Sequence, residues 1–198
     1  MRMPGIIALA AVLVLGSRGE AWAVKPSPQV TVAGGDFRTV LAAAPGQDTV
    51  RVASFRLDET PVTNAQFSAF LREQPQWRRD RVTRLFADPE YLSHWSKADQ
   101  ADAALADQPV TRVSWFAASA YCEAQGGRLP TWYEWEYVAA KGARGQPERV
   151  YPWGDTWDSQ KVVCGAVGKF NNFANVGGKS IRGGDTPQGI ADMAGNVI

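Results

Sequence analysis

The sequence predicts an α+β domain in which loops take up a large share of the chain. Two short segments with spaced apolar residues, at 29–39 and 50–57, predict β-strands near the N-terminus. Three helix-start patterns follow between residues 63 and 141. From residue 143 onward glycine, asparagine, aspartate and tryptophan dominate, which is typical of long structured loops. Strands and helices in separate blocks indicate the α+β class.

The first strand segment contains its own interruption. Val30 and Val32 stand on one face, and Gly34-Gly35 then predicts a turn or bulge. Residues 42–48 form the loop that leads to the second strand segment.

Each of the three helices has a recognisable start. A side-chain oxygen at the N-cap accepts a free backbone N–H. In a capping box, the side chain of a Glu or Gln three residues later also accepts the backbone N–H of the N-cap residue. The helix ends are marked by Pro75, by Gly126-Gly127 and by Lys141-Gly142. The start signals are Thr63 with Gln66, Ser114, and Thr131 with Glu134.

Residues 1–23 have the pattern of a secretory signal peptide. Arg2 precedes an apolar run at 6–15, and Ala21-Trp22-Ala23 supplies a small-residue cleavage site. The apolar run is much shorter than the roughly 20 residues that cross a bilayer, which disfavours the alternative of an uncleaved anchor. We therefore expect export to the periplasm or the extracellular space, with no membrane attachment after cleavage.

The predicted mature chain carries no net charge. Residues 1–23 hold two of the 21 Lys and Arg residues and one of the 20 Asp and Glu residues, so basic and acidic side chains become equal in number. Binding of nucleic acid begins with neutralisation of phosphates by a basic surface. A nucleic-acid partner is therefore not expected.

Residues 75–108 show no sustained period and predict a surface insertion. Its arginine cluster can face an acidic partner, but a solvated charged face is the favoured interpretation. The aromatic stretch Tyr91 to Trp95 is expected to pack down. His94, the only histidine, is interpreted as a packed side chain rather than a ligand or base, because the sequence places no partner near it. Most of the eight tryptophans are expected to anchor loops in the core.

The two cysteines leave alternatives open. Cys122 lies in a predicted helix and Cys164 in a predicted loop. A disulfide would need their Cα atoms within about 7 Å, and the alternative is a buried free Cys122. Neither cysteine has a partner at metal-ligand spacing, which argues against a zinc site.

Six short motifs follow one another in a fixed order. Together they resemble the formylglycine-generating enzyme family, also called the sulfatase-modifying factor domain, over the chain from about Val30 to its end. The motifs are Asp58-Glu59-Thr60-Pro61-Val62-Thr63-Asn64-Ala65-Gln66-Phe67, Pro109-Val110-Thr111-Arg112-Val113-Ser114-Trp115, Ala120-Tyr121-Cys122-Glu123, Arg128-Leu129-Pro130-Thr131 with Glu134-Trp135-Glu136-Tyr137, Tyr151-Pro152-Trp153-Gly154-Asp155, and Asp192-Met193-Ala194-Gly195-Asn196-Val197.

The resemblance implies a C-type-lectin-like fold and a specific chemistry. The better-known members oxidise a sulfatase cysteine to formylglycine with oxygen and a copper ion held by two cysteines, which lie downstream of the last motif. Here Ile198 stands where the family continues with Trp-Glu-Trp. We therefore expect residues 24–198 to be an incomplete domain, truncated at the C-terminus, without copper. Cys122 matches a structural helix cysteine of the family, and Cys164 falls in a loop.

A calcium site is implied in part. The resemblance carries a side-chain oxygen onto Asp192 and backbone carbonyls onto Gly195 and Val197, and it places Asn175 near a second site. Calcium takes six to eight oxygen ligands, so these groups would hold it weakly. The equal alternative is that they only shape turns.

The leading hypothesis is an exported member of this family that lacks oxidase activity, because the copper-binding segment is absent. Its partner would be a protein or peptide substrate such as a sulfatase, or an envelope redox enzyme. The alternatives are a non-catalytic lectin-like binding or maturation-accessory module in the cell envelope, and an inert fragment.

Overall fold

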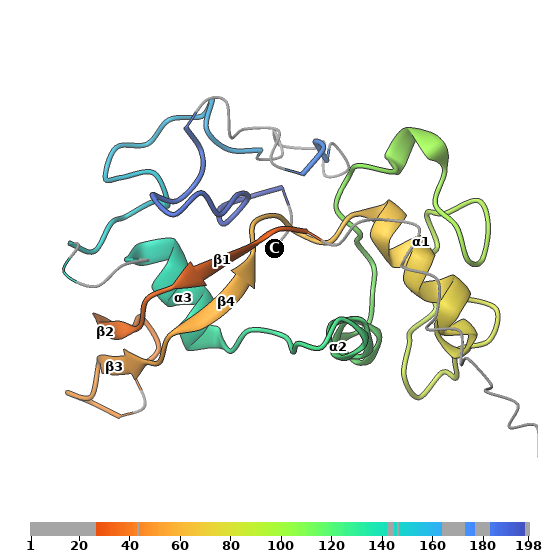
Figure 1. Cartoon of the computed structure of the whole chain (residues 1–198), viewed down its shortest axis with the longest axis horizontal. Helices are drawn as coiled ribbons and strands as arrows, with labels where there is room; N and C mark the ends of the chain where they lie inside the picture. Colours follow the sequence, from red (N-terminus) through yellow and green to blue (C-terminus); the bar gives the residue numbers. More distant parts are fainter. Residues whose placement is uncertain are drawn as a thin grey trace, which may run out of the picture.

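The structure is a computed structural model that describes residues 27–42, 44–141, 145, 147–163, 173–176 and 183–196. The predicted signal peptide, Cys164 and Val197 lie outside these residues. The described residues form two small antiparallel sheets, three α-helices and two short 3-10 helices, joined by long loops (Figure 1). This confirms the α+β, loop-rich prediction.

The two predicted strand segments each break into two strands. β1 (Gln29–Val32) pairs with β4 (Phe55–Asp58), and β2 (Gly35–Arg38) pairs with β3 (Thr49–Val52), both antiparallel. Gly34 lies at the first break, where an added Cβ would come within 2.4 Å of the Val52 carbonyl oxygen. The two backbones can therefore approach each other only because this residue has no side chain.

The helices begin where the caps predict. α1 (Asn64–Glu73) and α3 (Trp132–Ala140) each start with a complete capping box, and α2 (Trp115–Ala124) starts with the hydroxyl of Ser114 accepting the Ala117 N–H. After α1 the chain forms the 3-10 helix η1 (Pro75–Trp77), and the second, η2, covers Ala103–Leu105.

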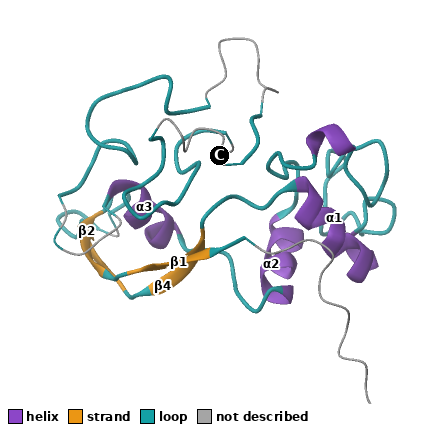
Figure 2. Ribbon diagram, turned by 45° about the horizontal axis from the view of Figure 1, so that its top comes forward, coloured by secondary structure: helices purple, strands orange, loops and turns teal. Residues whose placement is uncertain are grey.

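Two hydrophobic clusters organise the molecule. The sheets and α3 lie on one side in Figures 1 and 2, and α1 with α2 on the other. The sheet cluster comprises Val32, Phe37, Val52, Tyr137, Val138, Ile190 and Met193. The helix cluster comprises Phe67, Phe70, Leu71, Ala87, Tyr91, Leu92, Trp95, Ala117 and Tyr121.

Part of the segment 75–108 belongs to the helix cluster. Tyr91, Leu92 and Trp95 are all buried, which confirms that this aromatic stretch packs down. The guanidinium of Arg79 donates to the carbonyls of Leu92 and Trp95 at 2.7 and 2.9 Å. One arginine of the cluster therefore binds the segment's own backbone. The cluster comprises Arg78, Arg79, Arg81 and Arg84.

Asn64 connects this segment to α1. Its buried Nδ2 donates to the carbonyls of Leu105, Gln108 and Pro109, and its Oδ1 accepts the indole N–H of Trp95 at 3.0 Å. Both halves of one amide are thus satisfied by residues more than 30 positions away.

The expectation that most tryptophans anchor loops in the core is wrong for several of them. Trp95 is buried, but Trp115, Trp132, Trp135 and Trp157 are among the exposed large hydrophobic side chains. On α3 the helical period explains this, because Tyr137 and Val138 face the sheet cluster while positions 132 and 135 share another face. Within the described residues, none of the helices combines the length and apolar character needed to cross a bilayer.

Candidate functional site

The turn at 192–196 contains two of the four predicted calcium residues, Asp192 and Gly195, and is built around Asn196. The buried amide of Asn196 accepts the Ala174 N–H at 3.1 Å and donates to the Ala174 carbonyl at 3.3 Å and to the Asp192 carboxylate at 3.2 Å. Its backbone N–H donates to the Val163 carbonyl at 2.8 Å. One asparagine therefore ties three chain segments together.

Backbone conformation restricts which residues this turn accepts. Asp192, Gly195 and Asn196 all have positive φ, at 56°, 83° and 61°. Asp and Asn tolerate this left-handed region better than other residues with a side chain. At Gly195 a Cβ would also lie 2.4 Å from the Val163 carbonyl oxygen, so glycine is required there twice over.

Within the described part of the chain, the contacts around the predicted calcium residues run through Asn196. Asp192 contacts Asn196, and the same amide contacts Ala174, which directly precedes Asn175, while the side chain of Asn175 is exposed. Val197 lies outside the described residues. Among the residues that the structure describes, no three His, Cys, Asp or Glu side chains gather as metal ligands. Calcium binding therefore stays a prediction that depends on carbonyl oxygens.

Copper does not fit the described residues. Copper(I) selects soft thiolate ligands, and the thiol available here is that of Cys122, a half-buried free cysteine in α2. Burial raises the pKa of this thiol, and the negative charges of Asp58 and Glu123 add to the increase. The protonated thiol is a poor ligand and a poor nucleophile at neutral pH.

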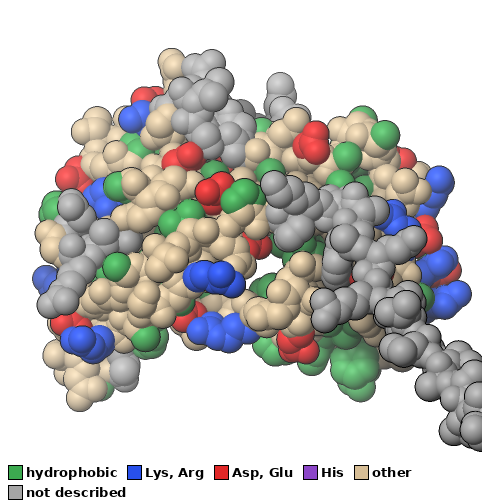
Figure 3. Space-filling view, viewed as in Figure 1, with side chains coloured by type: hydrophobic (Ala, Val, Ile, Leu, Met, Phe, Trp, Pro, Cys, Tyr) green, Lys and Arg blue, Asp and Glu red, His purple; other side chains and the backbone are tan. Residues whose placement is uncertain are grey.

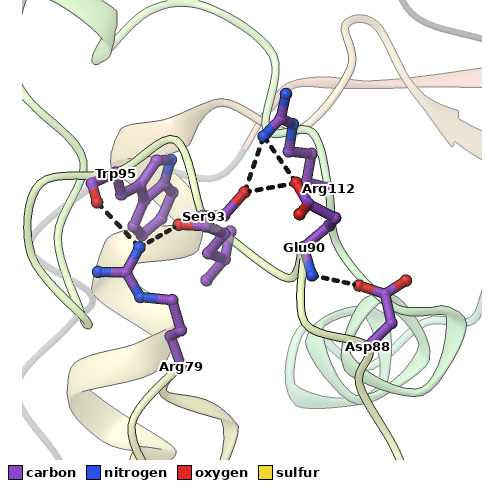
Figure 4. Close-up of polar contacts among 7 residues, drawn as sticks. Arg79, Asp88, Glu90, Ser93, Trp95 and Arg112 are labelled. Atoms are coloured by element: carbon purple, nitrogen blue, oxygen red, sulfur yellow. Dashed lines mark hydrogen bonds and ion pairs between the residues drawn. The ribbon is translucent and has the colours of Figure 1, made fainter.

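A second candidate site is a small pocket at the N-terminal end of α2. It encloses about 170 Å³ and is lined by Asp88, Glu90, Tyr91, Arg112, Val113 and Ser114. Figure 4 shows the Arg112 guanidinium between Glu90, at 3.2 Å, and the Ser93 hydroxyl, at 2.7 Å. The Asp88 carboxylate accepts the Glu90 N–H at 2.8 Å. Charges of both signs thus line one small opening.

The backbone is strained at one residue that lines this pocket and at one that follows a lining residue. Leu92 and Arg112 have φ values of 49° and 53°, and the Leu92 N–H donates to the Arg112 carbonyl at 2.9 Å. Residues with such side chains rarely adopt this conformation, and such strain gathers at functional sites. No sequence pattern signals a positive φ at leucine or arginine, so sequence analysis did not identify this pocket.

His94 lies beside the strained segment. Its ring packs edge-on to Trp95 with the ring centres 6.2 Å apart, in agreement with a packed side chain. Its Nδ1 is buried without a hydrogen-bond partner. Burial lowers the pKa of this imidazole, and the positive charges of Arg112 and Arg79 lower it further. The ring is therefore held in its neutral form.

Comparison with known proteins identifies the family. The model of the sulfatase-modifying factor enzyme 1-like domain matches residues 19–198, so the chain belongs to this family. A formylglycine-generating enzyme of Streptomyces coelicolor is 31% identical over 186 residues, which cover 72% of this chain and 58% of that protein. The inactive C-alpha-formylglycine-generating enzyme 2 of Mus musculus is 33% identical over 207 residues, covering 85% of this chain and 66% of that protein.

The fold has a solved counterpart. The crystal structure of CarF superposes with a TM-score of 0.58 at 21% identity, covering 87% of this chain and 78% of that one. This likeness supports the α+β fold alone. Since the chain spans little more than half the length of the Streptomyces enzyme, the activity and partners of that whole protein come to this chain only as a proposal.

Proposed function

We propose that this chain is an exported member of the formylglycine-generating enzyme family with a polypeptide target, that it lacks oxidase activity, and that the described residues between 27 and 196 supply its scaffold without a redox centre. The state of Cys122 carries this proposal. Its thiol is half-buried in a helix and its raised pKa keeps it protonated, so it lacks the thiolate that copper binding and sulfur chemistry require.

Oxidation of a thiol to an aldehyde tests the proposal directly. The purified chain is incubated with a cysteine peptide taken from a sulfatase, with copper and oxygen, while the Streptomyces formylglycine-generating enzyme serves as the positive control. The peptide mass is expected to stay unchanged with this chain. Formation of the aldehyde by this chain, and its loss in Cys122→Ser, would overturn the proposal.

Export is the second part of the proposal, supported by the signal-peptide pattern of residues 1–23. Expression in a Gram-negative host, followed by fractionation and intact-mass measurement, is expected to give a periplasmic protein that begins at Val24. A full-length protein in the cytoplasmic fraction would contradict export.

One observation favours a second function, the capture of a partner without chemistry. Two aromatic side chains at the start of α2, Trp115 and Phe116, are exposed. Such surfaces mark interaction sites more often than isolated apolar residues do. Partner capture predicts a stable complex with a target whose mass does not change, and the partner would be a sulfatase or an envelope redox enzyme.

A further inference from the structure

The exposed aromatic residues of α2 form one end of a continuous row of rings. Ring centres are 6.2 Å apart between Trp77 and Phe86, 5.1 Å between Phe86 and Phe116, and 5.5 Å between Phe116 and Trp115. All three pairs are close to edge-on, as aromatic pairs prefer. We call these four residues the aromatic row. It joins the segment 75–108 to α2.

The aromatic row runs from the protein interior out to solvent. Trp77 packs against the helix cluster, whereas Trp115 is 67% exposed, and Leu85, which directly precedes Phe86, is 79% exposed. Figure 3 shows hydrophobic side chains gathered over α2 at the lower edge of the molecule. Contact of such a contiguous apolar surface with water is unfavourable, and a partner that covers it lowers the free energy.

Two exposed arginines lie close in the sequence to Leu85 and Phe86. Arg78 is paired with Asp80 and Asp99, and Arg79 is bound to backbone carbonyls. Arg81 and Arg84 are exposed, and neither takes part in an ion pair among the described residues. Arg84 directly precedes Leu85 and Phe86. The surface therefore combines an apolar centre with two exposed cations outside the ion pairs, of which Arg81 is also attracted to the Asp80 carboxylate.

The small pocket continues this surface. Ser114 lines the pocket and directly precedes Trp115. The pocket encloses about 170 Å³, less than the roughly 300–1,000 Å³ of usual small-molecule sites, so it suits a single side chain. A flat apolar patch would fit many surfaces, but a patch with a side-chain-sized opening beside it fits a polypeptide.

From these contacts we infer that the aromatic row, Leu85 and the two arginines form a docking surface for an acidic polypeptide segment with an aromatic or aliphatic anchor. The anchor lies on Phe86, Phe116 and Trp115, and carboxylates beside it meet Arg81 and Arg84. Charge complementarity of this kind selects the partner and speeds its encounter. The inference rests on the proposed function only in that the partner is a polypeptide.

Two other occupants fit less well. An anionic lipid surface would attract the arginines, but it is negative over its whole area, so its headgroups would also meet the exposed carboxylates of Asp88 and Glu90, whereas a peptide can place its carboxylates at the arginines alone. A second copy of this chain in a two-fold dimer would place Arg81 and Arg84 of both copies on the same interface, where like charges repel. The acidic segment is the occupant that complements both the apolar and the cationic parts.

Fluorescence anisotropy with synthetic peptides tests this assignment. The probe is a labelled 12-residue peptide with four glutamates around two leucines and one phenylalanine. A second peptide has glutamine for every glutamate, and a third has serine for every apolar residue. Binding of the first is expected to be at least five-fold tighter than that of either control peptide, and to weaken as salt rises.

Surface variants show where the peptide binds. Leu85→Ser with Trp115→Ser, and separately Arg81→Glu with Arg84→Glu, should each weaken binding at least five-fold without a change in melting temperature, since all four side chains are exposed. The matched controls, Val40→Ser with Val150→Ser and Arg51→Glu with Arg56→Glu, change equally exposed residues elsewhere and should bind as the parent does.

Each remaining result overturns the inference. Equal binding by the three peptides, or binding that the surface variants leave intact, refutes it. Binding to vesicles of anionic phospholipid that the same variants abolish assigns the surface to a membrane instead. A concentration-dependent dimer in sedimentation, lost in the Leu85 and Trp115 variant, assigns it to a second copy. The thiol-oxidation assay is independent of all these outcomes, so failure of the proposed function is seen separately.

Discussion

The side chain of Asn64 provides a sharp test of how the segment 75–108 is held, because it bonds to both sides of the junction with α1. Asn64→Ala removes the acceptor of the buried Trp95 indole N–H and the donor shared by the carbonyls of Leu105, Gln108 and Pro109. The Gln108 carbonyl still accepts the backbone N–H of residue 64, and the Leu105 carbonyl still accepts the Gln108 N–H. The loss therefore falls on the Trp95 indole and on the Pro109 carbonyl.

The expected loss follows from these groups. A buried N–H without an acceptor costs about 1–3 kcal/mol. A carbonyl tolerates a missing partner better, so its contribution is roughly 1 kcal/mol. The free energy of unfolding should fall by about 3 kcal/mol, which lowers the melting temperature of a domain of this size by roughly 6–12 °C.

Urea and thermal denaturation measure the loss, and a double-mutant cycle assigns it. Trp95→Phe removes the indole donor, so Asn64→Ala should cost about 1–2 kcal/mol less in that background than in the parent. Gln100→Ala, an exposed amide of the same segment, is the control and should stay within about 0.5 kcal/mol. A loss below about 1 kcal/mol for Asn64→Ala, or an additive cycle, would refute this account of the junction.

Three other predictions concern single residues. Arg128 holds the pKa of Glu134 at about 2, below its unfolded value near 4.5. The ionised carboxylate therefore stabilises the fold by about 1–2 kcal/mol above pH 4.5, and this contribution disappears as the pH falls from 4.5 to 2. Glu134→Gln should flatten this pH dependence of the unfolding free energy, measured by urea titration. Gly195→Ala should lower unfolding free energy by at least about 2 kcal/mol more than Gly189→Ala, because both glycines have positive φ but open space surrounds only the second; equal losses would contradict the close approach. Ca²⁺ at ten times a millimolar Kd should raise the free energy of unfolding of the parent by about 1.4 kcal/mol and leave that of Asp192→Asn unchanged. A melting temperature that does not respond to a chelator would contradict calcium binding.

The parts of the fold that the sequence predicts are the local ones. A capping box depends on residues three positions apart, so Thr63 with Gln66 and Thr131 with Glu134 are visible in the sequence and present in the structure. The positive φ values of Leu92 and Arg112 occur instead where a hydrogen bond from the Leu92 N–H to the Arg112 carbonyl joins two segments that are distant in the sequence. No local sequence pattern encodes these φ values, and the pocket beside them cannot be predicted from the sequence for the same reason.

The candidate metal turn falls between these extremes. The glycine, aspartate and asparagine content of residues 192–196 predicts a tight turn, and the three positive φ values agree with it. The partner of Asn196 could not be predicted, because Ala174 lies 22 residues away in a loop without periodicity. Composition therefore identifies the turn but not what it joins.

Three residues from the six motifs have the same physical role. Asn64 joins α1 to the segment before α2, Glu134 joins the start of α3 to Arg128, and Asn196 joins the last turn to two other loops. Because both sheets in the described part of the chain are two-stranded, many backbone groups there have no ladder partner. Buried side-chain amides and carboxylates supply those bonds, and each works only with particular residues at particular places. The order of the motifs thus marks the scaffold shared by the family, whereas the aromatic row and its arginines lie largely between the motifs, where a member of the family can acquire its own partner.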